Sequence, residues 1–364
     1  MGLWSHFRLD LIMIKTMVPE RAGLVEPAAS VLAARILSTP KPVEQFVLPE
    51  LYCPFGSAVS RHAEVVDAGT NAWVRQHGFF AQERDYKRFS AVRLGWLAAR
   101  THPSSTRENL QNVADWCSWF FIRDDYYDEC GIGRYPAALI DLHTRFLEVL
   151  RGMQPTREDT PLTRALYDLW SRTQAAAPDV WKERFVHHME EFFDAGVWES
   201  RNRLTGMTPA VAIYLKMRPY AGGLYPFMDM FDFTEQVALP SELRDDPVVQ
   251  RLTTMANNIV CWSNDIMSLS KEIQHGEIHN LVLSMRLHQQ LTLQQAVDRA
   301  AALHDAEVRA FRELELRLPS RAGVVHPEIK RYVSVLGRFI RGSLDWLYTS
   351  RRYLIPATPV APVP

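Results

Sequence analysis

The 364-residue sequence predicts an all-α fold in which the helices form a single domain. Three observations predict this fold class. Apolar residues recur at the i, i+3, i+4 spacing of amphipathic helices through most of the chain. The period-two alternation that is typical of half-buried strands is scarce. Turn-forming residues, such as Gly131-Ile132-Gly133, fall between the helical segments, and no internal repeat or mid-chain linker divides the chain.

The two ends of the chain differ in composition from the middle. Residues 1–44 have no clear period and end in a proline-containing stretch, so we expect an N-terminal extension that is partly disordered, with one short helix around Pro27–Leu37. Residues 356–364 are rich in proline, alanine and valine, and we expect a disordered tail. The helical domain is therefore predicted to span residues 45–355.

Within this domain, a series of segments carries helix-like apolar spacing, and turn residues separate them. In chain order these segments are Arg84–Arg100, Glu108–Glu129, Pro136–Arg151, Thr160–Ala175, Asp179–Arg203, Pro209–Met217, Asp246–His275, Thr292–Arg317 and Pro327–Tyr348. Two of them, Glu108–Glu129 and Asp246–His275, also contain clusters of oxygen-bearing side chains and are the candidates for carrying function.

The first cluster is acidic and occupies residues 124–129. It continues a stripe of apolar residues at helical spacing, and Asp124 and Asp128 fall on the same stripe, with Glu129 beside them. Carboxylates at inward-facing positions are costly unless cations pair with them. The cluster therefore indicates a metal site, although a helix that simply emerges into solvent after Phe121 would show the same acids.

The second cluster consists of Asn264, Ser268 and Glu272, which are each four residues apart. On an α-helix these side chains stack along one face, about 6 Å apart per step. They offer amide, hydroxyl and carboxylate oxygens, a set that suits a hard divalent ion such as Mg²⁺. The alternative is an ordinary amphipathic helix with this polar side in water, opposite the apolar face that contains Trp262 and Leu269.

The two clusters together favour a metal site over solvated helix faces. Two such helices could hold Mg²⁺ ions between them, and a diphosphate would complete the coordination. Cationic or hydrogen-bonding side chains that could contact this anion are Arg218, Lys271, Arg352 and Tyr353. Arg218 also begins the stretch Arg-Pro-Tyr-Ala-Gly-Gly, where a break in the helix would free a backbone carbonyl.

Composition excludes several other classes of function. The chain has 41 basic and 42 acidic residues, a net charge of −1, which argues against a nucleic-acid partner. The four cysteines form no CxxC pair, so we expect a reduced, cytoplasmic protein. No apolar run approaches the ~18 residues of a membrane span. The sequence leaves open whether the chain forms a homodimer.

From residue 46 to Tyr353 the sequence resembles the bacterial class I terpene synthases (terpene cyclases), most of all those that make sesquiterpenes. Residues 124–129 match the aspartate-rich motif of that family, and residues 264–272 match its NSE triad, including the lysine at 271. Arg218 stands at the place of the diphosphate-sensing arginine and Gly222 at that of the effector glycine. Arg352-Tyr353 matches the terminal RY pair. Ala221 departs from the aspartate that is common at the linker position.

The resemblance implies a helical bundle with the active site in its core and three Mg²⁺ ions. Asp124, Asn264, Ser268 and Glu272 would bind the metals, supported by Asp128 and Glu129. Arg218, Lys271, Arg352 and Tyr353 would bind the substrate diphosphate, with Arg218 paired to Asp125 in a closed state. The aromatic faces of Phe120, Phe121 and Trp346 would stabilise a migrating carbocation, although packing in the core explains such residues equally well.

The activity so implied is that of a carbon–oxygen lyase: the ionisation and cyclisation of a linear prenyl diphosphate, most commonly C15 farnesyl diphosphate, to a cyclic sesquiterpene hydrocarbon or alcohol with release of diphosphate. A diterpene cyclase that acts on C20 geranylgeranyl diphosphate is the first alternative. A chain-elongating prenyltransferase would carry a second aspartate-rich motif instead of the triad. A phosphotransferase with an aspartate nucleophile would place that residue at the end of a strand, and a non-catalytic helical binding protein would not need intact metal ligands.

Overall fold

The computed structural model describes residues 44–353, with gaps at residues 130, 176, 319, 322 and 323. The predicted extension before residue 44, its short helix around Pro27–Leu37 and the predicted tail at 356–364 lie outside the described residues. In the part of the chain that is described, no helix combines the length and the apolar character that crossing a membrane requires.

The predicted all-α class is confirmed. The helices are α3 (Ala63–Gln76), α4 (Glu83–Ser90), α5 (Leu94–Thr101), α6 (Arg107–Glu129), the 3₁₀ turn η1 (Ile132–Arg134), α7 (Pro136–Leu150), α8 (Pro161–Gln174), α9 (Asp179–Thr205), α10 (Val211–Ala221), α11 (Leu224–Asp229), α12 (Phe231–Thr234), α13 (Ser241–Arg244), α14 (Pro247–His275), α15 (Leu281–His288), α16 (Leu293–Glu315) and α17 (Pro327–Thr349). Between α16 and α17, β1 (Ser320–Arg321) and β2 (Val324–Val325) form a two-residue antiparallel ladder that pairs Ser320 with Val325.

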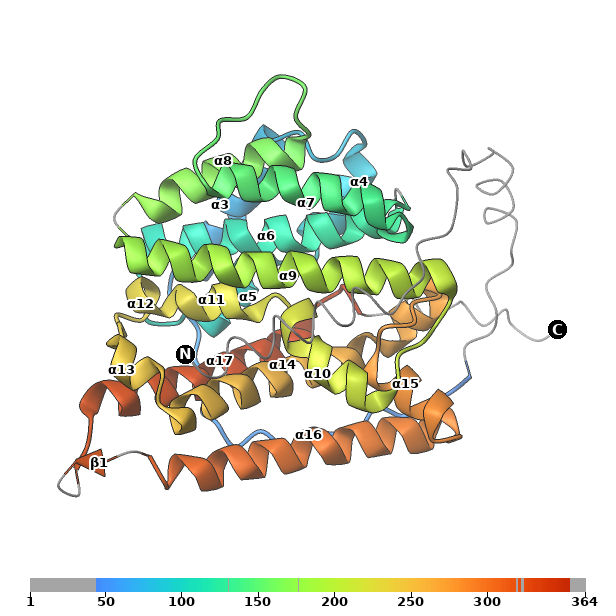
Figure 1. Ribbon diagram of the computed structural model, residues 1–364, viewed down its shortest axis with the longest axis vertical. Coiled ribbons are helices and arrows are strands. Elements are labelled where there is room, and N and C mark those ends of the chain that lie inside the picture. The colour runs from blue at the N-terminus through green and yellow to red at the C-terminus, as the bar shows by residue number, and fades with distance from the viewer. Residues whose placement is uncertain (1–43, 130, 176, 319, 322–323, 354–364) are drawn as a thin grey trace. The chain divides into compact units, whose positions relative to one another are not determined.

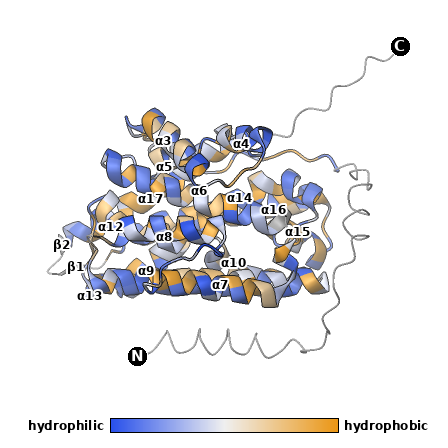
Figure 2. Ribbon diagram, turned by 90° about the horizontal axis from the view of Figure 1, so that it is seen from above, coloured by the Kyte–Doolittle hydropathy of each residue, from blue (hydrophilic) through white to orange (hydrophobic). Residues whose placement is uncertain are grey.

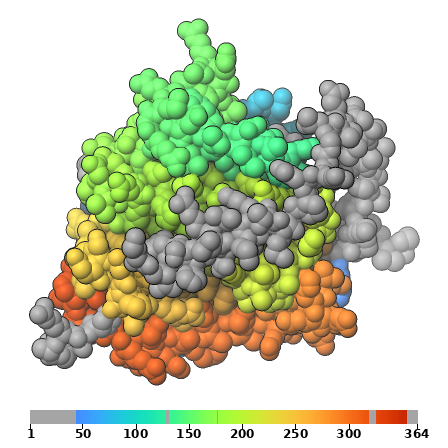
Figure 3. Space-filling view, in the orientation of Figure 1, coloured from blue at the N-terminus to red at the C-terminus, as the bar shows by residue number. Residues whose placement is uncertain are grey.

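The helices are arranged around α6, α9, α14 and α17, which contribute most of the cavity wall described below. Helix α6 packs against α3, α5 and α8, and α9 packs against α7, α10 and α11. Helix α14 packs against both α16 and α17. Figure 1 shows α7 and α8 along one edge of this bundle and α16 along the opposite edge. The space-filling view repeats this order on the surface (Figure 3).

Burial of one apolar stripe per helix explains this packing. Figure 2 shows that most helices carry both hydrophilic and hydrophobic residues, as expected of helices with one face in the core. In α6 the predicted stripe is buried at Val113, Trp116 and Cys117. In α14 the predicted apolar face is buried at Trp262 and Leu269. Burial of these residues thereby holds both helices in place, with the acids of α6 at the end of its buried stripe and the polar face of α14 opposite its apolar face.

Two predicted helices have different bounds in the structure. The segment Arg84–Arg100 is not one helix but two, α4 and α5, because Arg93 adopts the left-handed conformation with φ 58°. The segment Pro209–Met217 is α10, which continues through Pro219 to Ala221. It ends at Gly222-Gly223, where Gly223 has φ 65°, so the helix break predicted near Arg218 lies at these two glycines.

Candidate active site

Helices α6 and α14 bring the two predicted clusters to one cavity of about 250 Å³. Its lining includes Asp124 from α6 and Asn264, Ser268 and Glu272 from α14. Asp128 and Glu129 lie on the last turn of α6, and their side chains are outside the described part of the structure. Asp124 of the first cluster and all three residues of the second cluster therefore line the same cavity, although the Asp124 side chain is also 61% exposed.

Hydrogen bonds fix the three side chains of the second cluster. Ser268 Oγ donates to Glu272 Oε1 at 2.6 Å, which leaves the lone pairs of the hydroxyl free to face a cation. The Asn264 amide nitrogen donates to the Tyr353 hydroxyl at 3.0 Å, so its amide oxygen is turned the other way. The spacing of four residues on a helix, read from the sequence, produces this row of oxygen atoms.

Glu272 shows that the donor set fits a cation. Burial, together with the nearby carboxylate of Asp265, raises the pKa of Glu272 to about 8. The hydrogen bonds that it accepts come from neutral donors, Ser268 and Asn280. Among the described residues, no three His, Cys, Asp or Glu side chains converge as a metal-binding group. A mixed set of amide, hydroxyl and carboxylate oxygens is nevertheless suitable for a hard divalent ion.

Arg352 lines the cavity and is held by Asp125. Its two terminal nitrogens donate to the Asp125 carboxylate at 2.9 and 2.8 Å, and Lys271 Nζ lies 3.6 Å from the same carboxylate. Burial alone would raise the pKa of Asp125, but the Arg352 guanidinium lowers it to about 2. The guanidinium also lies over the ring of Phe121, 4.7 Å from its centroid. Asp125 therefore contacts Arg352 and Lys271 in this structure, not Arg218.

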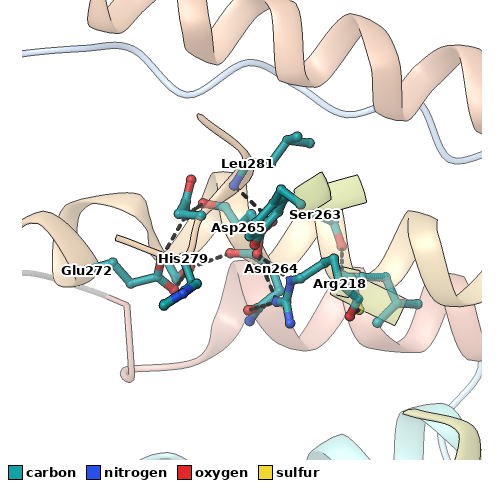
Figure 4. A network of polar contacts seen from close by, with 12 residues as sticks. Arg218, Ser263, Asn264, Asp265, Glu272, His279 and Leu281 are labelled. Atoms are coloured by element: carbon teal, nitrogen blue, oxygen red, sulfur yellow. Dashed lines mark hydrogen bonds and ion pairs between the residues drawn. The ribbon is translucent and has the colours of Figure 1, made fainter. Parts of the chain in front are cut away.

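Arg218 is paired with Asp265 instead, as Figure 4 shows. Its Nε donates to Asp265 Oδ1 at 3.0 Å, and its Nη2 donates to the amide oxygen of Asn264 at 3.2 Å. Burial alone would lower the pKa of Arg218, but Asp265 raises it well above its usual range. Arg218 and Gly222 both line the cavity. The arginine is thus a fixed cation in the site.

Part of the cavity lining is aromatic. Phe120 stacks on Phe192 with centroids 4.9 Å apart, and Phe121 meets Trp346 edge to face at 5.5 Å. Trp346 is buried, and its indole nitrogen donates to the Val92 carbonyl at 3.2 Å. All of the predicted diphosphate-contacting and aromatic residues line this one cavity. The site therefore combines charged and polar side chains with aromatic ones, and Phe121 and Trp346 contact Arg352 and Tyr353 directly.

Sequence reasoning missed one wall of the cavity, which α9 supplies. Phe192, Gly196, Glu199 and Arg203 all line the cavity. Their spacing of i, i+4, i+7 and i+11 puts them on one helix face, and a glycine inside a long helix is a second signal of close approach. Glu277 and His279 line the cavity as well, from a loop that carried no recognisable signal.

Comparison with known proteins identifies similar chains. The family model described as "Terpene synthase family 2, C-terminal metal binding" matches residues 115–310. A (+)-T-muurolol synthase from Roseiflexus castenholzii is 41% identical over 85% of this chain and 95% of its own length. A germacrene A synthase from Nostoc punctiforme is 35% identical over 85% of this chain and 96% of its own length.

Solved structures show the same fold. The SVS_A2 protein from ancestral sequence reconstruction superposes with a TM-score of 0.76 at 26% identity, covering 86% of this chain and 93% of that one. A linalool/nerolidol synthase from Streptomyces clavuligerus superposes with a TM-score of 0.73 at 24% identity, covering 83% of this chain and all (100%) of that one. The similarity thus extends over 83% to 86% of this chain.

Proposed function

This chain belongs to the terpene synthase family, and from that premise we propose that it cyclises farnesyl diphosphate to a sesquiterpene hydrocarbon or alcohol. One observation carries the proposal: the oxygen ligands, the cations that we assign to phosphate binding and the aromatic rings all line a single cavity. A prenyl diphosphate likewise combines an anionic head with an apolar chain. The name of the T-muurolol synthase specifies farnesyl diphosphate as the substrate of that relative, which supports the C15 choice over the C20 alternative.

The family model describes a metal-binding region, and divalent metal use follows from membership of the family. The further proposal is that three Mg²⁺ ions bind, held by Asp124, Asn264, Ser268 and Glu272, with Asp128 and Glu129 in support. The bound metal supplies Lewis-acid neutralisation of the charge on the departing diphosphate. The buried Glu272, which has only neutral hydrogen-bond donors around it, supports this assignment.

The remaining polar residues would bind the anion as it leaves. Arg218, Lys271, Arg352 and Tyr353 donate hydrogen bonds to diphosphate oxygens while the C–O bond of the substrate breaks and its electron pair leaves with the diphosphate. The backbone at Gly222 faces the cavity where the allylic cation forms. Phe120, Phe121 and Trp346 exclude water and present π faces to the cation until a proton is lost or one water adds.

The structure bears on two rival functions. Asp124 lies inside a helix, whereas the nucleophile of an aspartate phosphotransferase would follow a strand. A chain-elongating prenyltransferase would need a second aspartate-rich cluster, and this chain has the amide, hydroxyl and carboxylate of the triad in its place.

Activity in the cytoplasm forms part of the same proposal, because Cys53, Cys117 and Cys261 are free thiols. A homodimer is a proposal that light scattering on the purified protein tests.

The proposed function is tested by turnover of purified C10, C15 and C20 prenyl diphosphates with Mg²⁺, with products identified by gas chromatography and mass spectrometry. We expect a cyclic C15 product that Asp124→Asn and Asn264→Ala each abolish or lower by at least about a hundredfold, since each variant removes a metal ligand. The matched control is Glu108→Gln, an exposed acid on the first turn of the same helix.

The outcomes of this experiment are distinct. A C20 product without a C15 product would replace the substrate assignment by the diterpene alternative. A longer prenyl diphosphate formed from two substrates would identify a prenyltransferase. No hydrocarbon or alcohol from any of the three substrates would overturn the cyclase proposal itself.

A further inference from the structure

Asn280 connects the end of α14 to the start of α15 with both atoms of its side-chain amide. Its oxygen accepts from the backbone nitrogens of Val282 (2.7 Å) and Leu283 (3.4 Å) and so caps α15. Its nitrogen donates to Glu272 Oε2 at 2.7 Å and to the backbone carbonyl of Asp265 at 2.6 Å. Asn280 has no exposed surface. One buried side chain therefore both begins a helix and orients a carboxylate that we assign to the metal site.

Asp265, next to Asn264, performs the same task for Arg218. Its Oδ1 accepts from Arg218, with Nη2 at 2.8 Å, and its Oδ2 accepts from the Tyr214 hydroxyl at 2.7 Å and the Leu281 backbone nitrogen at 3.2 Å. The Asp265 side chain is only 1% exposed, so these partners replace water entirely. The carboxylate holds the guanidinium in one orientation, and its backbone carbonyl is the group that shares the Asn280 amide with Glu272.

A continuous set of buried hydrogen bonds thus joins Arg218 to Glu272 by way of Asp265 and Asn280. Figure 4 shows its two ends, with Asp265 beside Arg218. A second route runs through Asn264 and Ser268, which we assign to the metal itself. Buried networks of this kind have few alternative geometries, because every displaced donor or acceptor would be left without water. A shift of the Arg218 guanidinium toward an anion would change its hydrogen bonds to Asp265. A displacement of Asp265 would then move its backbone carbonyl, which accepts from the same Asn280 amide that donates to Glu272.

We propose that Asp265 and Asn280 are positioning residues that couple diphosphate binding at Arg218 to metal binding at Glu272. The inference rests on the proposed function, since it assumes that Arg218 contacts the diphosphate and that Glu272 contacts the metal. Coupling of this kind is reciprocal. The factor by which bound diphosphate raises the affinity for metal equals the factor by which bound metal raises the affinity for diphosphate. Neither Asp265 nor Asn280 is among the residues that line the cavity.

The test is a double-variant cycle on the affinity for inorganic diphosphate, measured by isothermal titration calorimetry at a fixed, saturating Mg²⁺ concentration. Asn280→Ser retains an oxygen that can cap α15 and removes the amide that reaches Glu272. Arg218→Lys retains the charge and removes the fork that Asp265 holds. If the network couples the sites, the combined loss of affinity should be at least about fivefold smaller than the product of the two single losses.

The matched control combines Asn280→Ser with Arg352→Lys. Arg352 is also a predicted diphosphate ligand, but it is bonded to Asp125, outside the network. In this pair the losses should multiply. A purely structural role for Asn280 would lower the melting temperature and give multiplicative losses in both cycles. Far-UV circular dichroism establishes that each variant is folded. Should Asn280→Ser not fold, Asp265→Asn combined with Glu272→Gln tests the same connection from its other end.

Failure of the inference and failure of the proposed function are distinguishable. If the unmodified protein does not bind diphosphate in the presence of Mg²⁺, the proposed function is wrong. If it binds diphosphate and the cycle of positions 280 and 218 is multiplicative, the proposed function stands and the coupling role of Asp265 and Asn280 is overturned.

Discussion

At Gly222 the contact between α10 and α14 leaves no room for a side chain. A Cβ atom at this position would lie 2.4 Å from the Sγ atom of Cys261, a buried residue of α14. The next residue, Gly223, has φ 65°, and the chain turns there from α10 into α11. Because Arg218 and Gly222 line the cavity from this turn, the absence of a side chain at residue 222 allows the close approach of α10 to α14.

Gly222→Ala is therefore expected to lower kcat/KM for the prenyl diphosphate by at least about tenfold, since overpacking a close contact costs about 1–3 kcal/mol and displaces the α10–α11 turn. Adding Cys261→Ala removes the clashing sulfur and should restore part of the loss. The matched control is Gly56→Ala, because a Cβ at Gly56 meets no atom within 4 Å. The measurement is kcat/KM of the three variants under steady-state conditions. An equal kcat/KM for Gly222→Ala and Gly56→Ala would contradict the packing argument.

Neighbouring residues of the acidic cluster also differ in ways that the sequence did not reveal. The Asp124 side chain is 61% exposed and lines the cavity, whereas Asp125 is bound to Arg352 through both of its oxygens. Both are aspartates in one short motif, and helical spacing alone separates them by only about 100°. Arg352, which is 227 residues from Asp125 in the chain, forms two hydrogen bonds with Asp125 and only a longer ion pair of 3.6 Å with Asp124. Sequence spacing could not predict this difference.

At the scale of the element, long amphipathic helices were predictable and short ones were not. Helices α6, α14 and α16 were predicted within two residues at each end, because each has a long apolar stripe. Helices α3, α11, α12, α13 and α15 were not predicted. Several of these have a single turn or two, so their few residues carry little periodicity, and tertiary packing determines them. The left-handed residue that separates α4 from α5 is an arginine, which has no preference for that conformation.

Helix α16 begins with a capping box whose contribution can be measured separately from the site. Thr292 Oγ1 accepts from the Gln295 backbone nitrogen at 3.2 Å, and Gln295 Oε1 accepts from the Thr292 backbone nitrogen at 2.9 Å. Thr292→Ala should lower the free energy of unfolding by about 1 kcal/mol, measured in urea, while Thr292→Ser should lower it by less. No residue of α16 is among those that line the cavity, so kcat should stay at the level of the unmodified protein. A large loss of kcat in Thr292→Ala would show that α16 acts on the site through α14.

At the scale of the whole molecule, the interior around the cavity holds titratable side chains that must be neutral in the folded state. His102 follows α5 and has no exposed surface. Its ring packs against Phe231 at 5.4 Å and Phe339 at 6.1 Å between centroids, which join it to α12 and α17. Burial lowers the pKa of His102 from 6.5 to about 3. The bundle as a whole therefore becomes less stable when this histidine is protonated on unfolding.

The sign of the resulting pH dependence follows from proton binding. Between pH 6.5 and about 3 the unfolded chain carries a proton on His102 that the folded protein does not, so acidification favours unfolding in this range. The contribution of His102 is complete above pH 6.5 and falls by about 1.4 kcal/mol for each pH unit below it. His102→Gln removes the titrating group. Its free energy of unfolding at pH 7.5 should be lower than that of the unmodified protein, because glutamine fills the site less well. The difference between the two proteins should then shrink by about 1.4 kcal/mol per unit as the pH falls from 6.5 to 4.5. Urea unfolding at pH 7.5, 6.0 and 5.0 measures both curves, and parallel curves across this range would mean that His102 accepts a proton without unfolding of the α5–α17 contact.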